Sequence, residues 1–218
     1  MTEAISASRR GHIFVIAAPS GTGKTTLCRH LLERDPRLRL SVSHTTRLMR
    51  PGEEEGVHYH FVTVKAFRDL NERNAFLEHA EYGGNLYGTS LDAIEGLLET
   101  GRDVVLEIEV QGAAQIKERR SDACLIFLLP PSLEVLEKRL QGRGTDSEDV
   151  IQTRMALVDR ELAAAPLFDF AVVNDELARA VDEVLELISG VRQGRSEMLA
   201  ERFGREAVLV RWHARQQA

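Results

Sequence analysis

Two glycines, a lysine and a threonine stand close together near the start of the chain, at Gly21, Gly23, Lys24 and Thr25. Glycines let a short loop turn tightly with its backbone N–H groups directed inward, which makes a nest for phosphate oxygens. A lysine ammonium can reach the terminal phosphates of a nucleotide, and the hydroxyl beside it can coordinate Mg²⁺. These residue types in this order indicate phosphoryl-transfer chemistry on a nucleoside triphosphate.

The elements that must position this loop follow from the residues on either side of it. Residues 13–17 form a short apolar run, rich in β-branched side chains, that is typical of a buried parallel strand. Leu27, Leu31 and Leu32 then recur at helical spacing. Strand, loop and helix therefore occur in the order that the phosphate-binding pattern G-x-x-x-x-G-K-[ST] requires, although Ala18 stands where its first glycine is expected.

We therefore predict that this loop binds ATP, with Mg²⁺ held at Thr25 and the ammonium of Lys24 at the β- and γ-phosphates. The alternative is a glycine turn next to a solvated lysine, but the order of strand, loop and helix favours the functional interpretation. The predicted loop consists of Ala18, Pro19, Ser20, Gly21, Thr22, Gly23, Lys24, Thr25 and Thr26.

A second group of side chains could hold another phosphate. Arg47 and Arg50 offer two guanidinium groups, which bind phosphate through paired hydrogen bonds, and Tyr59 and Tyr87 add two phenol hydroxyls. Taken one at a time, each residue has a simpler explanation, because exposed arginines are usually solvated and tyrosine rings are often half-buried. The residues by themselves leave both interpretations open.

Length and charge exclude several functional classes. A chain of 218 residues can bury a proper core, and it forms one domain or one domain with small inserted lobes. The net charge of −6 and the pI near 5.7 argue against a general nucleic-acid-binding protein. Residues 1–10 lack the apolar stretch of a signal peptide, and no apolar run approaches the length of a membrane span.

The two cysteines, Cys28 and Cys124, lie far apart on a predicted helix and a predicted strand, without metal-ligand spacing. We expect buried free thiols rather than a disulfide, which suits a reducing cytosol. The prediction is therefore a soluble, cytoplasmic protein without nucleic-acid or membrane partners. The sequence leaves the oligomeric state open.

Strands alternate with helices along most of the chain, which predicts an α/β fold with a parallel sheet covered by helices on both faces and ligands at the carboxyl ends of the strands. A detour over residues 43–90 predicts a small mixed lobe inserted into this sheet, with a hairpin turn at 83–85. The predicted strands cover 13–16, 38–45, 57–62, 76–82, 86–87, 104–110, 124–129 and 170–173. The predicted helices after the loop cover 65–73, 92–100, 133–140, 145–163 and 177–191, with another short helix beyond residue 194.

Several ordered blocks of sequence resemble the guanylate kinase family between residue 13 and about residue 175. So many blocks in the same order leave little room for coincidence. The blocks are SVSHTTR at 41–47, RPGE at 50–53, GVHYHF at 56–61, FLE at 76–78, GNLYGT at 84–89, EIEVQG at 107–112, GRGT at 142–145 and VND at 173–175.

The resemblance implies a P-loop kinase that transfers the γ-phosphoryl of ATP to GMP or dGMP, with Mg²⁺ as cofactor and ATP as co-substrate. It implies that the inserted lobe binds GMP. Guanine presents N1–H and N2–H₂ donors, so a carboxylate such as Glu78 is a natural acceptor for this base. The implied phosphate ligands are Arg47, Arg50, Tyr59 and Tyr87, and the implied guanine contacts are Ser43, Glu78, Thr89 and Glu107.

The loop near residue 143 resembles the family's mobile lid, which implies that Arg139, Arg143 and Arg154 join Lys24 as catalytic cations. Asn174 matches a segment near the adenine of ATP. The alternative for the arginines is a helix-surface role in which they pair with neighbouring carboxylates, for which Glu134, Glu137 and Glu148 are available.

Glu109 departs from the family, in which aspartate commonly occupies this position. Its extra methylene favours contact with a metal-bound water rather than with Mg²⁺ itself. The predicted organisation is a core at 12–42, 91–138 and 158–194, a GMP-binding lobe at 43–90, a lid at 139–157, and a C-terminal extension of unknown role at 195–218.

Two competing functions remain. Guanylate-kinase-like domains also occur as peptide-binding modules of scaffolding proteins, but such a module has no need of Lys24, Thr25 and the lid arginines together. A P-loop kinase for another phosphorylated small molecule could use Arg47 and Arg50, but it has no need of a guanine-reading set around Glu78.

Overall fold

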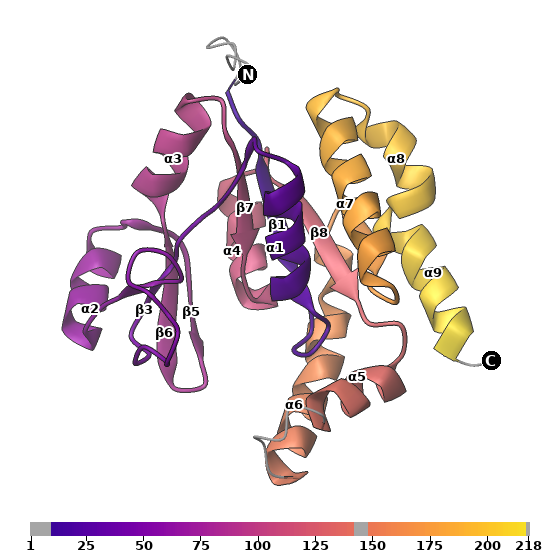
Figure 1. The fold of residues 1–218 in the computed structure, drawn as a ribbon, viewed down its shortest axis with the longest axis horizontal. Coiled ribbons are helices and arrows are strands. Elements are labelled where there is room, and N and C mark those ends of the chain that lie inside the picture. Colours follow the sequence, from indigo (N-terminus) through magenta and orange to yellow (C-terminus); the bar gives the residue numbers. More distant parts are fainter. Residues whose placement is uncertain (1–9, 142–147, 217–218) are drawn as a thin grey trace. The chain divides into compact units, whose positions relative to one another are not determined.

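The computed structural model describes residues 10–141 and 148–216, and for residues 148–154 it describes the backbone alone. The chain separates into two compact units, whose elements are labelled in Figure 1. Unit 1 contains the residues up to Ile13 together with Arg37–Ala123. Unit 2 contains Phe14–Pro36 together with the residues from Cys124 onward.

Unit 2 is built on three parallel strands in the order β1 (Ile13–Ala17), β8 (Cys124–Leu129) and β9 (Phe170–Val173). Every residue of β1 and β8 is buried, as expected for the continuous apolar sequences of parallel strands. The helices of this unit are α1 (Lys24–Arg34), α5 (Leu133–Gln141), α6 (Glu148–Ala163), α7 (Leu177–Arg192), α8 (Ser196–Phe203) and α9 (Arg205–Gln216), with a 3₁₀ turn at Ala165–Leu167.

Unit 1 contains the parallel pair β2 (Leu38–Leu40) and β7 (Asp103–Glu107). It also contains a mixed sheet in the order β4 (His60–Phe61), β3 (His44–Thr45), β6 (Asn85–Ser90) and β5 (Phe76–Tyr82). Only β3 and β4 are parallel within this sheet. The helices of unit 1 are α2 (Val64–Glu72), α3 (Leu91–Glu99) and α4 (Val110–Arg119).

The hairpin of unit 1 confirms the turn predicted from the sequence. Tyr82 pairs with Asn85, so the loop between β5 and β6 has two residues, Gly83 and Gly84. Their φ angles of 58° and 75° lie in the left-handed region that a tight hairpin turn needs and that glycine adopts without strain.

The single strand predicted over residues 38–45 is wrong. The structure has two short strands there, β2 and β3, which belong to different sheets. The N–H of Ser41 still bonds to the carbonyl of Val105 at 3.0 Å, after which the chain leaves β7 and pairs with β6. Of the strand predicted over residues 57–62 only β4 forms, because a turn closes from the N–H of Gly56 to the carbonyl of Tyr59 at 2.9 Å.

The strand predicted over residues 104–110 is wrong beyond Glu107, where β7 ends. Val110 begins α4, a helix that the sequence pattern did not predict, and Glu109 occupies its N-cap position. The residues from Glu107 to Val110 alternate polar and apolar, so the strand pattern continues past the point where the strand ends.

The short helix predicted beyond residue 194 is two helices, α8 and α9, which join at Gly204. The N–H of Gly204 bonds to the carbonyl of Ala200 at 2.9 Å, and a Cβ at this position would lie 2.3 Å from that same oxygen. Only glycine therefore fits this close approach between the two helices. Phe203, Val208 and Trp212 bury their side chains and hold both helices to the unit.

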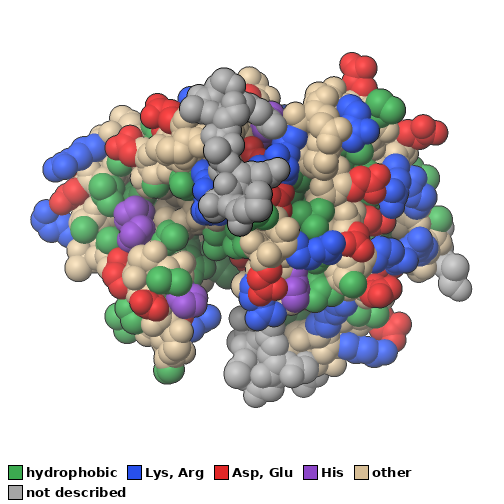
Figure 2. Space-filling view, turned by 45° about the horizontal axis from the view of Figure 1, so that its top comes forward, with side chains coloured by type: hydrophobic (Ala, Val, Ile, Leu, Met, Phe, Trp, Pro, Cys, Tyr) green, Lys and Arg blue, Asp and Glu red, His purple; other side chains and the backbone are tan. Residues whose placement is uncertain are grey.

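The fold class predicted from the sequence is confirmed. Each unit contains parallel strands accompanied by helices, β1, β8 and β9 in unit 2 and β2 and β7 in unit 1, and a second, mixed sheet is present in unit 1. Cys28 and Cys124 are buried and are not joined in a disulfide, as predicted. No helix in the described part of the chain is long and apolar enough to cross a membrane. Figure 2 shows basic and acidic side chains interspersed over the face that it presents.

Candidate active site

The glycine loop of unit 2 connects β1 to α1, as predicted. Gly21 and Gly23 have φ angles of 89° and 97°, and the N–H of Thr22 bonds to the carbonyl of Pro19 at 3.1 Å. Gly23 is the N-cap residue and Lys24 is the first residue of α1. The loop therefore ends at a helix N-terminus, whose first N–H groups and positive dipole end favour a phosphate.

Both glycines also stand where a side chain would collide. A Cβ on Gly21 would lie 2.9 Å from Leu140 Cδ2 and 3.1 Å from Leu136 Cδ1, both in α5. A Cβ on Gly23 would lie 2.7 Å from the Nδ2 of Asn174. The loop is therefore packed directly against α5 and the segment after β9.

Asn174 and Arg139 both contact this loop. Asn174 Nδ2 donates to the carbonyl of Thr22 at 2.7 Å, and Arg139 Nη1 donates to the same carbonyl at 3.3 Å. Arg139 Nη2 donates to the carbonyl of Asn174 at 3.4 Å. The alternative was a surface pair with Glu134, Glu137 or Glu148. Glu134 bonds to Lys138 at 2.6 Å and Glu137 accepts from Gln141 at 3.5 Å, while the side chain of Glu148 lies outside the described part of the structure.

The chemically active side chains of the loop lie at the start of α1. Lys24 is half-buried and Thr25 is exposed. The hydroxyl of Thr22 is buried and has no hydrogen-bond partner among the described residues. Of the other predicted catalytic arginines, Arg143 lies outside the described residues, and Arg154 belongs to α6, with only its backbone described.

In unit 1 the structure brings together three of the four predicted guanine contacts. Glu78 and Thr89 face each other across the β5–β6 pair, and Thr89 Oγ1 donates to Glu78 Oε1 at 2.5 Å. Ser43 Oγ lies 3.4 Å from Thr89 Oγ1. Glu78 is 3% exposed and Thr89 is 0% exposed. A buried carboxylate is therefore held with one oxygen on a hydroxyl, which suits an acceptor for paired base donors.

Helix α4, which the sequence analysis did not predict, packs against this carboxylate and holds it in place. A Cβ on Gly112 would lie 2.4 Å from Glu78 Oε2, so the helix can approach the carboxylate only with glycine here. The side-chain amide of Gln115 makes two hydrogen bonds with the backbone of His79. Its Oε1 accepts from His79 N at 3.2 Å, and its Nε2 donates to the carbonyl of His79 at 2.7 Å. Arg119 Nη1 donates to the carbonyl of Leu77 at 2.9 Å.

The two arginines of the predicted phosphate cradle share one partner, Glu53. Arg47 forms an ion pair with Glu53 at 2.7 Å, and the N–H of Arg50 donates to Glu53 Oε2 at 2.8 Å. The Arg47 hydrogen bond holds the pKa of Glu53 below its usual range, although burial acts in the opposite direction. Glu53 belongs to the block at 50–53 that resembles the family, but it was not predicted as a site residue.

Two tyrosines and a glutamate complete this side of unit 1. The guanidinium of Arg47 lies 5.4 Å from the ring centre of Tyr59, and the rings of Tyr59 and Tyr87 are 6.0 Å apart. Burial raises the pKa of Tyr59, and the charge of Glu107 raises it further. Glu107, at the end of β7, therefore acts on the same phenol that the arginine contacts.

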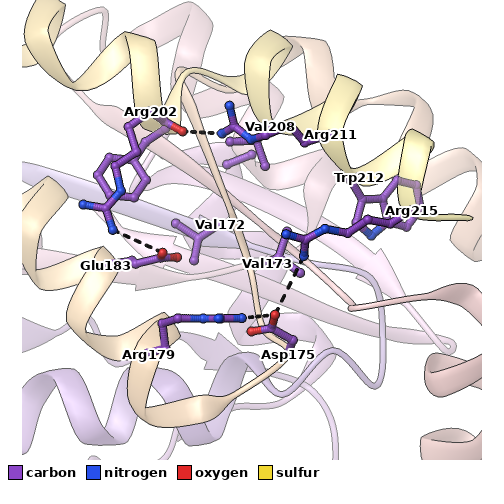
Figure 3. Close-up of a pocket in the computed structure, with 12 residues that line it drawn as sticks. Val172, Val173, Asp175, Arg179, Glu183, Arg202, Val208, Arg211, Trp212 and Arg215 are labelled. Atoms are coloured by element: carbon purple, nitrogen blue, oxygen red, sulfur yellow. Dashed lines mark hydrogen bonds and ion pairs between the residues drawn. The ribbon is translucent and has the colours of Figure 1, made fainter.

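A separate cavity of about 260 Å³ lies within unit 2, lined by β9, α7, α8 and α9 (Figure 3). Its arginines already have protein acceptors: for example, Arg202 bonds to Glu183 at 3.4 Å and Arg211 donates to the carbonyl of Arg202 at 2.5 Å. These contacts link the C-terminal helices, so we assign the cavity a structural role. Its four arginines are Arg179, Arg202, Arg211 and Arg215.

Comparisons with known proteins agree with this arrangement. The guanylate kinase family matches the chain over residues 10–191. Guanylate kinase of Neisseria meningitidis serogroup A is 52% identical over 195 residues, covering 89% of this chain and 95% of that protein. Guanylate kinase of Dechloromonas aromatica is 48% identical over 199 residues, covering 88% and 98%. The crystal structure of guanylate kinase from Anaplasma phagocytophilum has a TM-score of 0.71 and 30% identity, covering 89% of this chain and 96% of that one.

Proposed function

This chain belongs to the guanylate kinase family, and we propose that it transfers the γ-phosphoryl of ATP to GMP with two half-sites, one on each unit. The reaction gives ADP and GDP and belongs to purine nucleotide metabolism. The ATP half-site is the glycine loop with Arg139 and Asn174, and the GMP half-site is the set of residues around Glu78 and Arg47.

The observation that carries the substrate assignment is the buried carboxylate of Glu78. One of its oxygens accepts from Thr89 at 2.5 Å, and the side chain is shielded from water. Guanine offers two adjacent donors on its Watson–Crick edge, whereas adenine has no matching pair, so a fixed carboxylate selects guanine. A base without these donors would forgo its hydrogen bonds to the buried carboxylate, a loss of about 1–3 kcal/mol.

We assign the GMP phosphate to the cradle of unit 1. Arg47 and Arg50 supply guanidinium donors, and Tyr59 and Tyr87 supply phenol hydroxyls. Glu53 fixes the guanidinium of Arg47 and the backbone at Arg50 before a ligand arrives, which lowers the entropy lost when the phosphate is clamped. These contacts carry no information about the base, and they serve GMP and dGMP alike.

On the ATP side, the chain positions the phosphates and compensates their charge. The loop N–H groups hold the phosphate oxygens, and Lys24 neutralises the charge that develops on the transferring group. Arg139 lies beside the loop, and we assign Arg143 and Arg154 to the same task from the lid at 139–157. A phosphate oxygen of GMP attacks the γ-phosphorus directly, so the chain needs no covalent intermediate.

Mg²⁺ suits the donors that the chain offers. Thr25 is an exposed residue in the first turn of α1 and carries a hydroxyl oxygen, and Mg²⁺ prefers hard oxygen donors supplemented by phosphates and water. When bound, Mg²⁺ supplies charge neutralisation on the nucleotide phosphates. Thr25 would hold the ion, and Glu109 at the N-cap of α4 would hold one of its waters.

We also propose that the lobe at 43–90 and the lid at 139–157 close over the two nucleotides, which excludes water and prevents ATP hydrolysis. The protein acts in the cytoplasm, a location supported by two buried cysteines that form no disulfide, Cys28 and Cys124.

A coupled assay for ADP tests the proposal with ATP and each of GMP, dGMP, IMP and AMP. We expect activity with GMP and dGMP, a large loss with IMP, which lacks the N2 amino group, and negligible activity with AMP. Omitting Mg²⁺ and adding a chelator should abolish turnover. Comparable kcat/KM values for GMP and AMP would contradict the guanine assignment of Glu78.

A further inference from the structure

The start of helix α5 is completed by a side chain from the C-terminal helix α9. The first N–H groups of a helix lack partners within the helix. Ser132 Oγ accepts one of them, from Val135 N at 3.1 Å. Gln216 Oε1 accepts another, from Leu133 N at 3.2 Å, and Gln216 Nε2 donates to the carbonyl of Pro131 at 3.1 Å. One amide from α9 thus bonds on both sides of the point where α5 begins.

A second residue of α9 holds the segment just before α5. Trp212 Nε1 donates to the carbonyl of Pro130 at 2.6 Å, and the tryptophan side chain is 3% exposed. Pro130 and Pro131 have no N–H groups, so their carbonyls are the backbone groups through which this segment can be anchored. Both carbonyls accept from side chains of α9.

Helix α5, which α9 anchors at its start, contacts the ATP half-site. Its buried residues Leu136 and Leu140 form the surface against which the glycine loop packs at Gly21. From the same helix, Arg139 donates to the carbonyl of Thr22 at 3.3 Å. A displacement of α5 would therefore move the arginine and the floor of the loop together.

Helix α9 also approaches the other segment that contacts the loop. Arg215 Nη1 lies 3.9 Å from Asp175 Oδ2, a contact that Figure 3 shows beside the cavity. Asp175 directly follows Asn174, whose amide bonds to Thr22. Because the Arg215 side chain is 62% exposed, this pair adds little, and the contacts of Trp212 and Gln216 carry the inference.

We propose that α9 is a brace for the ATP half-site, and that Gln216 and Trp212 are positioning residues that act through α5 on Arg139 and the glycine loop. This inference rests on the proposed function, in which Arg139 serves the transferring phosphate. It gives a role to a segment that lies beyond residues 10–191, the part of the chain that the family matches.

The test compares Gln216→Leu with Val210→Ala, a substitution at a 70% exposed position of the same helix. Loss of the Gln216 amide should lower kcat roughly 5- to 50-fold and raise KM for ATP, because small misplacements of catalytic groups are costly. KM for GMP and the melting temperature should change little, and Val210→Ala should match the wild type. Hydrogen exchange should speed up at the first amides of α5.

A double-mutant cycle with Arg139→Ala separates positioning from general stabilisation. If Gln216 acts through Arg139, the double variant should be only slightly slower than Arg139→Ala, so that the two effects are not additive. Trp212→Phe keeps a ring but removes the N–H donor. Like Gln216→Leu, it should lower kcat and leave KM for GMP nearly unchanged.

The outcomes are distinguishable. Wild-type kcat and KM for ATP in both Gln216→Leu and Trp212→Phe would overturn the brace and leave the proposed function intact, provided that Arg139→Ala is impaired. Fully additive effects would also overturn the brace. An unimpaired Arg139→Ala would instead remove Arg139 from the proposed function, and the brace with it.

Discussion

Glu53 holds the guanidinium of Arg47 through two parallel hydrogen bonds, from Nη2 to Oε1 at 2.7 Å and from Nη1 to Oε2 at 3.0 Å. The side chains are only 13% and 17% exposed, so the pair is shielded from water more than a surface ion pair is. Such two-pronged pairs fix the plane of the guanidinium as well as its position. The orientation of the phosphate cradle therefore depends on a carboxylate that itself has no attraction for phosphate.

Glu53→Gln should weaken binding of every nucleoside monophosphate, because an amide turns one NH₂ group toward the Arg47 donors. Hydrogen bonds to charged groups contribute about 1.5–3 kcal/mol, so KM for GMP and for IMP should each rise roughly 10- to 100-fold. The ratio of kcat/KM for GMP and IMP should stay constant. Glu54→Gln, at the exposed neighbouring position, is the control, and a changed base ratio in Glu53→Gln would contradict this role.

Glu78→Gln should change base choice. The substitution places an NH₂ donor toward the donors of guanine, so kcat/KM for GMP should fall roughly 30- to 1000-fold. Steady-state kinetics with GMP and IMP should show that the preference for GMP is lost, whereas Arg50→Ala should weaken both substrates and keep the preference. If the GMP:IMP ratio is unchanged in Glu78→Gln, Glu78 does not read the base.

Lys24→Met should fold normally and lose turnover. The charge of Lys24 is needed at the β- and γ-phosphates, and removing one preorganised electrostatic group costs about 10²-fold or more in kcat. Circular dichroism and the melting temperature should match the wild type. Phosphorylation of GMP near the wild-type rate would refute the assignment of the glycine loop.

His44 should make the GMP half-site less stable in mild acid. Burial lowers the pKa of His44, the charge of His60 lowers it further, and Glu55 acts in the opposite direction. The unfolded chain then binds more protons than the folded one between the ordinary pKa of about 6.5 and the lowered value. The contribution of neutral His44 is fully present above pH 6.5 and is lost as the pH falls through the lowered pKa.

The matching measurement is the melting temperature between pH 7.5 and pH 5. The wild type should lose stability over this window, and His44→Gln, which cannot titrate there, should lose less of it. Equal losses in the two proteins would show that other groups cause the acid sensitivity.

Short sequence patterns predicted the elements whose conformation depends on neighbouring residues in the sequence. The hairpin at Gly83 and Gly84 follows from two glycines between alternating strands, and the glycine loop follows from the order of strand, loop and helix. The prediction of one strand over residues 38–45 failed for a tertiary reason. Polar and apolar residues alternate without a break there, although the chain leaves one sheet for another between β2 and β3. Helix α4 was missed because strand-like alternation continues to Val110.

The site could be predicted as far as ligand chemistry is visible in side-chain types. Glu78, Thr89 and Ser43 meet as a set that the family resemblance implied, and Arg139 meets the loop. Supporting residues were missed because their function depends on distance in space. Gln115 and Gln216 have no distinctive sequence pattern, yet each satisfies backbone groups beside a predicted site residue or its helix.

Strand β9 pairs with β8 on one side only. On the other side the described part of the chain gives it one isolated bridge, from Phe170 to Gly204, with α8 and α9 packed over the remainder. The unpaired backbone groups of an edge strand are a template for another chain. A chain that ends at Gly194 would expose that template, so we expect it to aggregate with rising concentration, as light scattering would show. We therefore expect the C-terminal helices to protect solubility as well as geometry.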